Sequence, residues 1–94
     1  MLVLIAYDVA TGTPKGARRL RRVAQACQDY GRRVQKSVFE CQVGATHWAM
    51  LRTRLLDEIN GEEDSLRFYF LDQDTKVEHH GANAPVDLEG PLVV

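Results

Sequence analysis

Asp8 is the residue whose type and position best suit chemistry, because it stands near the end of an almost unbroken apolar run over residues 2–9. Such a run, followed at once by turn residues, is typical of a strand buried on both faces. The carboxylate then lies where the strand leaves the core, and carboxylates are common ligands of magnesium. Aspartate at a strand end is also a common turn or cap residue, so both interpretations are open.

One carboxylate makes a weak magnesium site, since such sites combine one or two carboxylates with waters and substrate phosphate oxygens. In a two-fold dimer, two copies of Asp8 can face each other and share one Mg²⁺ or Mn²⁺, with a bound water as the nucleophile. Asp72 and Asp74 end a later strand and could supplement this site or form an acidic turn. His79 and His80 lack a partner at metal-ligand spacing.

The chain has 94 residues, which is the length of one domain and excludes two. Cys27 and Cys41 fall on apolar positions and lack a second pair at zinc spacing, so we expect buried free thiols. No apolar run approaches the length that spans a bilayer, and the first apolar segment lacks a basic region before it and a cleavage site after it. We therefore expect a cytoplasmic protein with no membrane partner.

The formal net charge is −1, yet the charges are distributed unevenly along the chain. The basic residues of the first half are Lys15, Arg18, Arg19, Arg21, Arg22, Arg32, Arg33 and Lys36. Only Asp29 opposes them there, whereas acids dominate from Asp57 onward. This split favours a basic face for a polyanion, with a merely solvated charged face as the common alternative. The helix arginines repel one another by roughly a few tenths of a kcal/mol per pair, which a bound anion would relieve.

Two helices are predicted. The first covers residues 15–30, with Thr13 as its N-cap and Gly31 as a left-handed C-cap. The second begins at a Thr46 cap and continues through Ile59. Their apolar stripes consist of Ala17, Leu20, Val23, Ala24 and Cys27 in the first helix, and of Trp48, Leu51, Leu55, Leu56 and Ile59 in the second. Met50 falls outside its stripe and should be exposed.

Residues 33–43 alternate as a strand does, and whether they form one strand or two with a break near Lys36 and Ser37 is open. Residues 65–71 form an aromatic, alternating strand, and a weaker strand is expected at residues 76–79. The order is that of an α+β, ferredoxin-like βαββαβ sandwich, with an antiparallel sheet and two helices on one face. We expect a homodimer through the other face, which a lone chain would leave uncovered.

The whole chain, residues 1–94, is expected to form a single ferredoxin-like domain whose core spans residues 1–72. Residues 73–94 supply the weak strand and a C-terminal segment that ends in the apolar residues 91–94. A short apolar terminus on a small domain often adds a strand to a neighbouring chain. We therefore expect this segment to cross to the partner.

Five segments, in this order, form a recognisable set of motifs. They are Tyr7-Asp8-Val9, Arg18-Arg19-Leu20-Arg21-Arg22-Val23, residues 31–34, Gln35-Lys36-Ser37-Val38-Phe39-Glu40-Cys41 and Asp64-Ser65-Leu66-Arg67-Phe68-Tyr69. Together they resemble the small CRISPR-associated proteins of the Cas2 family. The likeness runs from about residue 2 to residue 71, and the Ser-Val-Phe-Glu-Cys segment is its most specific part.

The resemblance implies a ferredoxin-like homodimer that acts with the CRISPR integrase (the Cas1 protein) in acquiring new spacers. It also implies a magnesium-dependent nuclease of single-stranded RNA or double-stranded DNA, with Asp8 from each subunit as metal ligand and catalytic residue. The residues that would meet the nucleic acid are Arg18, Arg19, Arg22 and Arg33 at the phosphates, with Tyr7 and Phe39 flanking the site. The C-terminal segment would pair with the partner's sheet.

Two hypotheses from different classes remain. The first is a metal-dependent phosphodiesterase in which Asp8 from both chains positions magnesium and a water for in-line attack. The second is a non-catalytic DNA-binding scaffold that bridges integrase subunits, with arginines on the duplex backbone and steep salt dependence. A more distant alternative is a ferredoxin-like regulatory module or a toxin-type ribonuclease of the virulence-associated D family.

Overall fold

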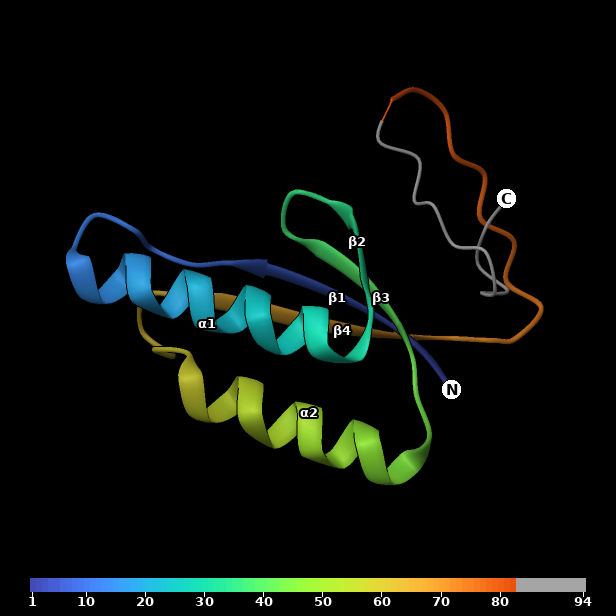
Figure 1. The fold of residues 1–94 in the computed structure, drawn as a ribbon, viewed down its shortest axis with the longest axis horizontal. Coiled ribbons are helices and arrows are strands. Elements are labelled where there is room, and N and C mark those ends of the chain that lie inside the picture. The colour runs from blue at the N-terminus through green and yellow to red at the C-terminus, as the bar shows by residue number, and fades with distance from the viewer. Residues whose placement is uncertain (83–94) are drawn as a thin grey trace.

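The computed structural model describes residues 1–82 of the chain. Its elements are β1 (Leu2–Asp8), α1 (Pro14–Tyr30), β2 (Arg32–Gln35), β3 (Val38–Gln42), α2 (Ala45–Glu58) and β4 (Ser65–Leu71) (Figure 1). This is the predicted βαββαβ order. The predicted crossing of the C-terminal segment concerns residues that lie outside the described part of the chain.

The four strands form one antiparallel sheet in the order β2-β3-β1-β4. β1 is therefore a central strand, with β3 on one side and β4 on the other. Its pairing with β4 runs from Leu2 opposite Leu71 to Asp8 opposite Ser65. The order and the direction of the strands confirm the predicted ferredoxin-like α+β fold.

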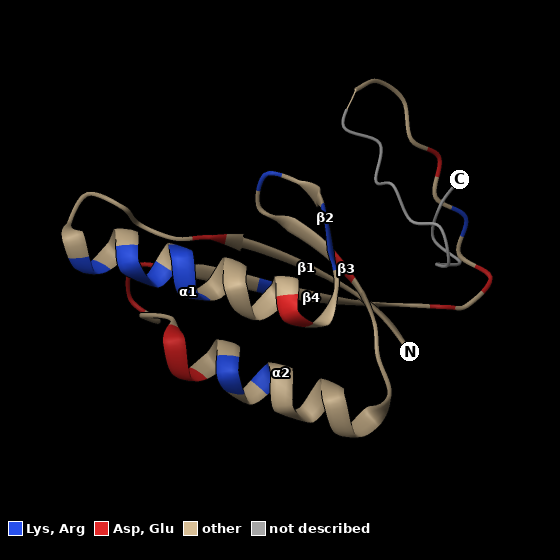
Figure 2. Cartoon of the chain, viewed as in Figure 1, with Lys and Arg blue, Asp and Glu red and all other residues tan. Residues whose placement is uncertain are grey.

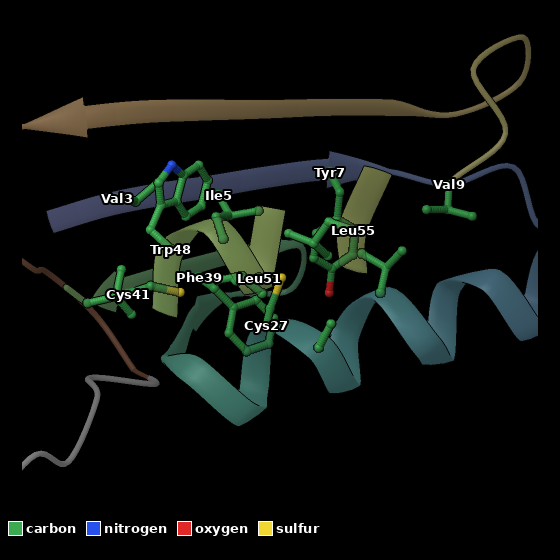
Figure 3. Packing of buried hydrophobic residues seen from close by; sticks show 13 residues of the cluster. Val3, Ile5, Tyr7, Val9, Cys27, Phe39, Cys41, Trp48, Leu51 and Leu55 are labelled. Carbon is green, nitrogen blue, oxygen red and sulfur yellow. The ribbon is translucent and has the colours of Figure 1, made fainter. Parts of the chain in front are cut away.

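Both helices pack on one face of the sheet, and the hydrophobic core lies between the two layers (Figure 3). Trp48 belongs to this core as predicted, with its ring edge-on to Phe68 at a centroid distance of 4.8 Å. Met50 is exposed, also as predicted. The placement of Leu56 in the core stripe is wrong, because Leu51 and Leu55 face the sheet and turn Leu56, 41% exposed, toward solvent.

Residues 33–43 form two strands, because a turn at Lys36 and Ser37 separates β2 from β3. The register shifts between Arg33 and Gln35, so the two short strands pair through a bulge. The weak strand expected at residues 76–79 is not formed. No described strand pairs with these residues, and an extended segment without such hydrogen bonds is not a strand.

Gly31 ends α1 in an extended conformation, with φ −158° and ψ −159°, so the predicted left-handed C-cap is wrong. A Cβ at this position would overlap the Cys41 Sγ and the Glu40 carbonyl oxygen. The glycine is therefore needed for close packing of the helix end on β3. The predicted Thr46 cap is also wrong, since the N-cap of α2 is the extended Gly44, two residues earlier, and the helix begins at Ala45.

The side chains of Leu4, Ala6 and Asp8 point away from the helices, because successive residues of a strand alternate between faces. We call this side of β1, together with the same side of β4, the open face. No helix of the described residues covers it, and Leu4 and Ala6 are only half-buried. The prediction that β1 is buried on both faces is therefore correct only for the face that packs against the helices. Neither described helix is long and apolar enough to cross a membrane.

Candidate functional site

Asp8 is the last residue of β1, and its side chain is exposed at one end of the open face. Asp8 lies opposite Ser65 in the β1–β4 pairing. The neighbouring pair on the same face of the sheet is Ala6 with Arg67. The carboxylate is thus placed beside a hydroxyl-bearing residue and near a cation. It is held by a regular strand rather than by a loop, which limits its freedom to move.

The described residues of one chain do not complete a metal site. No group of three or more His, Cys, Asp and Glu side chains among them could hold a metal ion. Asp72 and Asp74 follow the far end of β4, roughly 20 Å from Asp8 along the strand, so they cannot supplement it. The carbonyl of Asp72 accepts a hydrogen bond from the Thr75 amide at 3.0 Å, as in a turn. Carboxylate oxygens are ligands that suit magnesium, and a second copy of Asp8 would be needed for the site to contain two carboxylates.

Tyr7 and Phe39 stack inside the core, with ring centroids 6.2 Å apart and an interplanar angle of 23°. Phe39 is fully buried and Tyr7 is 6% exposed. A buried ring cannot stack on a base, so these two rings are not accessible for direct contact with nucleic acid. The guanidinium of Arg33 lies over the Phe39 ring, 5.1 Å from its centroid. Arg33 is exposed, and the aromatic pair therefore supports a surface cation from below.

An open cavity of about 580 Å³ adjoins Arg33. Its lining residues are Arg33, Val34, Gln35, Lys36, His79, His80 and Ala82. Two permanent cations and two histidines thus meet at the β2–β3 turn. Burial raises the pKa of the Tyr7 hydroxyl, and the nearby Arg33 charge opposes that rise.

Basic residues gather along the first half of α1, as Figure 2 shows. Arg18 and Arg21 are exposed. Arg22 is also exposed but lies 3.2 Å from the Glu58 carboxylate at the end of α2. Arg18 is thus better placed than Arg22 to meet a phosphate, because Arg22 must first give up or share its partner.

Arg19 points in another direction from its neighbours. Its Nε donates to the Asp64 Oδ2 at 2.8 Å, and its Nη2 lies 3.2 Å from the Glu63 carboxylate. The Asp64 side chain is fully buried, while that of Arg19 is 15% exposed. The hydrogen bond from Arg19, foremost, holds the pKa of Asp64 below its usual value. Arg19, expected at the phosphates, is occupied inside the chain.

Asp64 was not singled out from the sequence as a functional residue. It ends an acidic turn, and only its place at the head of the Asp-Ser-Leu-Arg-Phe-Tyr motif could have marked it. Its carboxylate also accepts hydrogen bonds from the backbone amides of Ala10, at 3.0 Å, and Asn60, at 2.8 Å. One buried carboxylate therefore ties together the β1–α1 loop, α1 and the α2–β4 turn.

Among the described residues, the remaining buried titratable groups are two cysteines and one glutamate. Burial raises the pKa of Cys27 to about 12 and that of Cys41 to about 11. Both thiols are free and buried, as predicted, and neither has thiolate character near neutral pH. Glu40 is also buried, and burial raises its pKa against the opposing charge of Arg32, 3.8 Å away.

Comparison with known proteins gives a consistent result. A family model described as CRISPR associated protein Cas2 matches residues 1–78. A protein of Chlorobaculum tepidum named CRISPR-associated endoribonuclease Cas2 is 57% identical over the whole of both chains. A CRISPR-associated endonuclease Cas2 of Halalkalibacterium halodurans is 55% identical, with 99% of each chain covered.

A solved structure has the same fold. The crystal structure of Streptococcus pyogenes Cas2 at pH 6.5 superposes with a TM-score of 0.76. The two chains are 48% identical, and the match covers 86% of this chain and 100% of the other. The predicted resemblance thus extends to both sequence and fold.

Proposed function

Because this chain belongs to the CRISPR-associated Cas2 family, we propose that it is a divalent-metal-dependent endonuclease that hydrolyses phosphodiester bonds in RNA or DNA. The observation that carries the proposal is the exposed Asp8 carboxylate at the end of a central strand. The names of the relatives include both endoribonuclease and endonuclease, so the nucleic acid is left open between the two. We further propose that the protein acts with the CRISPR integrase in spacer acquisition.

The active form in this proposal is a homodimer through the open face. Half-buried apolar side chains at Leu4 and Ala6, and a Tyr69 that is 42% exposed, support such an interface. Asp8 lies at the end of the same face, so two-fold symmetry can bring two carboxylates together. A magnesium or manganese ion held by the two copies would supply Lewis acidity and a more acidic bound water.

The side chains that would hold the substrate are basic and exposed. Arg33 and Arg18 would bind phosphate oxygens and orient the backbone, Arg22 would do so on release from Glu58, and the Tyr7–Phe39 pair would fix Arg33. Positioning of the scissile phosphate in line with a water is the part of the chemistry that these residues perform.

A second candidate function is a non-catalytic, dimeric DNA-binding scaffold that bridges integrase subunits. The observation that favours it is the imbalance between one carboxylate per chain at the candidate site and several exposed arginines. Such a scaffold would bind the phosphate backbone of DNA without reading its sequence.

The experiment compares the parent with Asp8→Asn and, as a matched control, Asp72→Asn, on labelled single-stranded RNA and duplex DNA. We expect cleavage by the parent and by Asp72→Asn with Mg²⁺ or Mn²⁺, none with EDTA, and none by Asp8→Asn, which should still bind nucleic acid. Cleavage by Asp8→Asn at the parent rate would contradict the nuclease and identify a contaminant. Binding without cleavage by any of the three would favour the scaffold.

The dimer is tested by sedimentation equilibrium of the parent and of Tyr69→Asp. Tyr69 is exposed, and its hydroxyl accepts a hydrogen bond from Arg67 at 3.0 Å on the surface, so the variant should fold. We expect a dimer for the parent and a weaker one for the variant, because a charge on the open face would have to be desolvated. A parent that is monomeric at all concentrations would contradict the shared site.

A further inference from the structure

The backbone of Ala10, two residues after Asp8, is held at its amide and at its carbonyl group. Its amide donates to the Oδ1 of Asp64 at 3.0 Å. Its carbonyl oxygen lies so close to Gly16 that a Cβ on that glycine would overlap it. The first turn of α1 thus packs against the carbonyl of the same residue whose amide Asp64 binds. The segment that leaves Asp8 is fixed by contacts from two other parts of the chain.

The carboxylate that holds Ala10 is itself held by Arg19. Both Asp64 oxygens accept from the guanidinium, Oδ2 from Nε at 2.8 Å and Oδ1 from Nη2 at 3.3 Å. Oδ2 also accepts the amide of Asn60 at 2.8 Å. Because the Asp64 side chain is fully buried, its charge depends on these donors. Arg19 therefore stabilises the buried Asp64 carboxylate and does not belong to the exposed basic residues of α1.

We propose that Asp64 and Arg19 are positioning residues that fix the strand end bearing Asp8, acting through the backbone amide of Ala10, and that Arg19 does not contact the nucleic acid. The inference rests on the proposed function, since the position of Asp8 matters most when its carboxylate binds a metal. Asp8 itself has one ladder neighbour at its own level, Ser65 on β4. The Ala10 contact supplies a second constraint beyond the end of the strand.

The variants are Asp64→Asn, which keeps the shape of the side chain, and Arg19→Lys, which keeps the charge but cannot bridge both oxygens. Arg19→Lys also covers the case in which Asp64→Asn does not fold. Glu63→Gln is the matched control, because Glu63 is the exposed second partner of Arg19 and does not bind Ala10. Each variant is first compared with the parent by circular dichroism and sedimentation.

Two readouts are used besides cleavage. One is the affinity for Mn²⁺, measured by electron paramagnetic resonance. The other is hydrogen exchange at the Ala10 amide, measured by NMR. We expect Asp64→Asn and Arg19→Lys to lower Mn²⁺ affinity about tenfold, as changes behind a metal ligand commonly do, and to speed exchange at Ala10. Glu63→Gln should change neither. Parent-like Mn²⁺ affinity in a folded Asp64→Asn or Arg19→Lys would overturn the inference.

A third readout separates Arg19 from the surface arginines. Duplex binding is measured against salt concentration for Arg19→Gln, and the slope should equal that of the parent, whereas each lost phosphate contact lowers it by about 0.9. A slope lower by that amount would overturn the internal role of Arg19. Mn²⁺ binding that survives Asp8→Asn would overturn the proposed function and this inference together. Binding lost in Asp8→Asn but unchanged in Asp64→Asn would overturn the inference alone.

Discussion

Arg33 and Phe39 form a cation–π pair across β2 and β3, with the guanidinium carbon 5.1 Å from the ring centroid. The ring is fully buried, whereas the arginine is exposed. A guanidinium on an aromatic face retains its hydrogen-bond donors at its edge, so it can still bind phosphate. Phe39 is thus connected to nucleic-acid binding through Arg33 and not by stacking on a base.

The first prediction concerns this pair. Arg33→Ala should weaken duplex binding and lower its salt slope by about 0.9, as expected for one phosphate contact. Phe39→Leu keeps an apolar core residue, should cost about 1 kcal/mol of stability, and should weaken binding less than Arg33→Ala. Fluorescence anisotropy over a salt series measures both. Arg54→Ala is the control, because Arg54 is already paired with Asp29 at 2.7 Å. Unchanged binding by Phe39→Leu would show that the ring does not support Arg33.

The second prediction compares Arg18 with Arg22. Arg18 is exposed, while Arg22 lies 3.2 Å from Glu58, so Arg18→Gln should reduce affinity more than Arg22→Gln. The loss of slope should be about 0.9 on duplex DNA and about 0.7 on single-stranded RNA. Neither variant should change the melting temperature. Equal effects of the two variants would mean that Glu58 releases Arg22 when nucleic acid binds.

Local patterns were sufficient for both helices, for most of the strands and for the place of Asp8 at the end of β1. The apolar run before Asp8, the Thr13 cap and the stripe of Trp48 each depend on neighbours within a few residues. Thr13 indeed accepts the Gly16 amide at 3.1 Å. Whether a turn at Lys36 and Ser37 divides residues 33–43 could not be decided, because neither glycine nor proline marks it.

Contacts between distant segments account for what the sequence did not reveal. Asp64 lies 54 residues from Ala10 and 45 from Arg19, so its role exists only in the folded chain. Gly31 was assigned by its type to a left-handed cap, whereas its packing against Cys41 requires a missing side chain. Arg19 is an arginine in the same cluster on α1 as Arg18, Arg21 and Arg22, so neither its residue type nor its spacing sets it apart. Only its direction, which depends on where the α2–β4 turn lies, distinguishes it.

The third prediction concerns the two cysteines. Burial is the foremost cause that raises the pKa of Cys27 to about 12 and that of Cys41 to about 11. The charge interaction with Cys41 raises the pKa of Cys27 further, and that with Glu40 raises the pKa of Cys41. Because the thiolate is the reactive form, iodoacetamide at pH 8 should modify neither residue in the folded protein and both in guanidinium. Mass spectrometry after a short exposure measures this. Rapid modification of native Cys27 would contradict its burial.

The fourth prediction concerns acid stability. The pKa of Asp64 is lowered in the folded chain, first by the Arg19 hydrogen bond and further by the Asn60 and Ala10 amides. The resulting stabilisation is complete above the ordinary aspartate pKa of about 4 and is lost as the pH falls through the lower folded-state value. Urea unfolding between pH 3 and pH 7 should show this loss in the parent. Asp64→Asn should be about 3 kcal/mol less stable at pH 7, with a smaller decline toward acid. An equal decline in both proteins would assign the effect to other carboxylates.

The fifth prediction compares two glycines at the start of α1. A Cβ on Gly16 would overlap the Ala10 carbonyl oxygen and approach the Thr11 Cα to 3.3 Å, whereas Gly12 has nothing within 4 Å of that position. Backbone atoms cannot move aside as a flexible side chain can, so Gly16→Ala should displace the loop after Asp8. It should cost about 1–3 kcal/mol although alanine favours helices. Gly12→Ala should leave stability nearly unchanged. Thermal unfolding and the Mn²⁺ affinity of both variants measure the effect, and a Gly16→Ala protein as stable as the parent would mean that α1 can shift away from Ala10 at little cost.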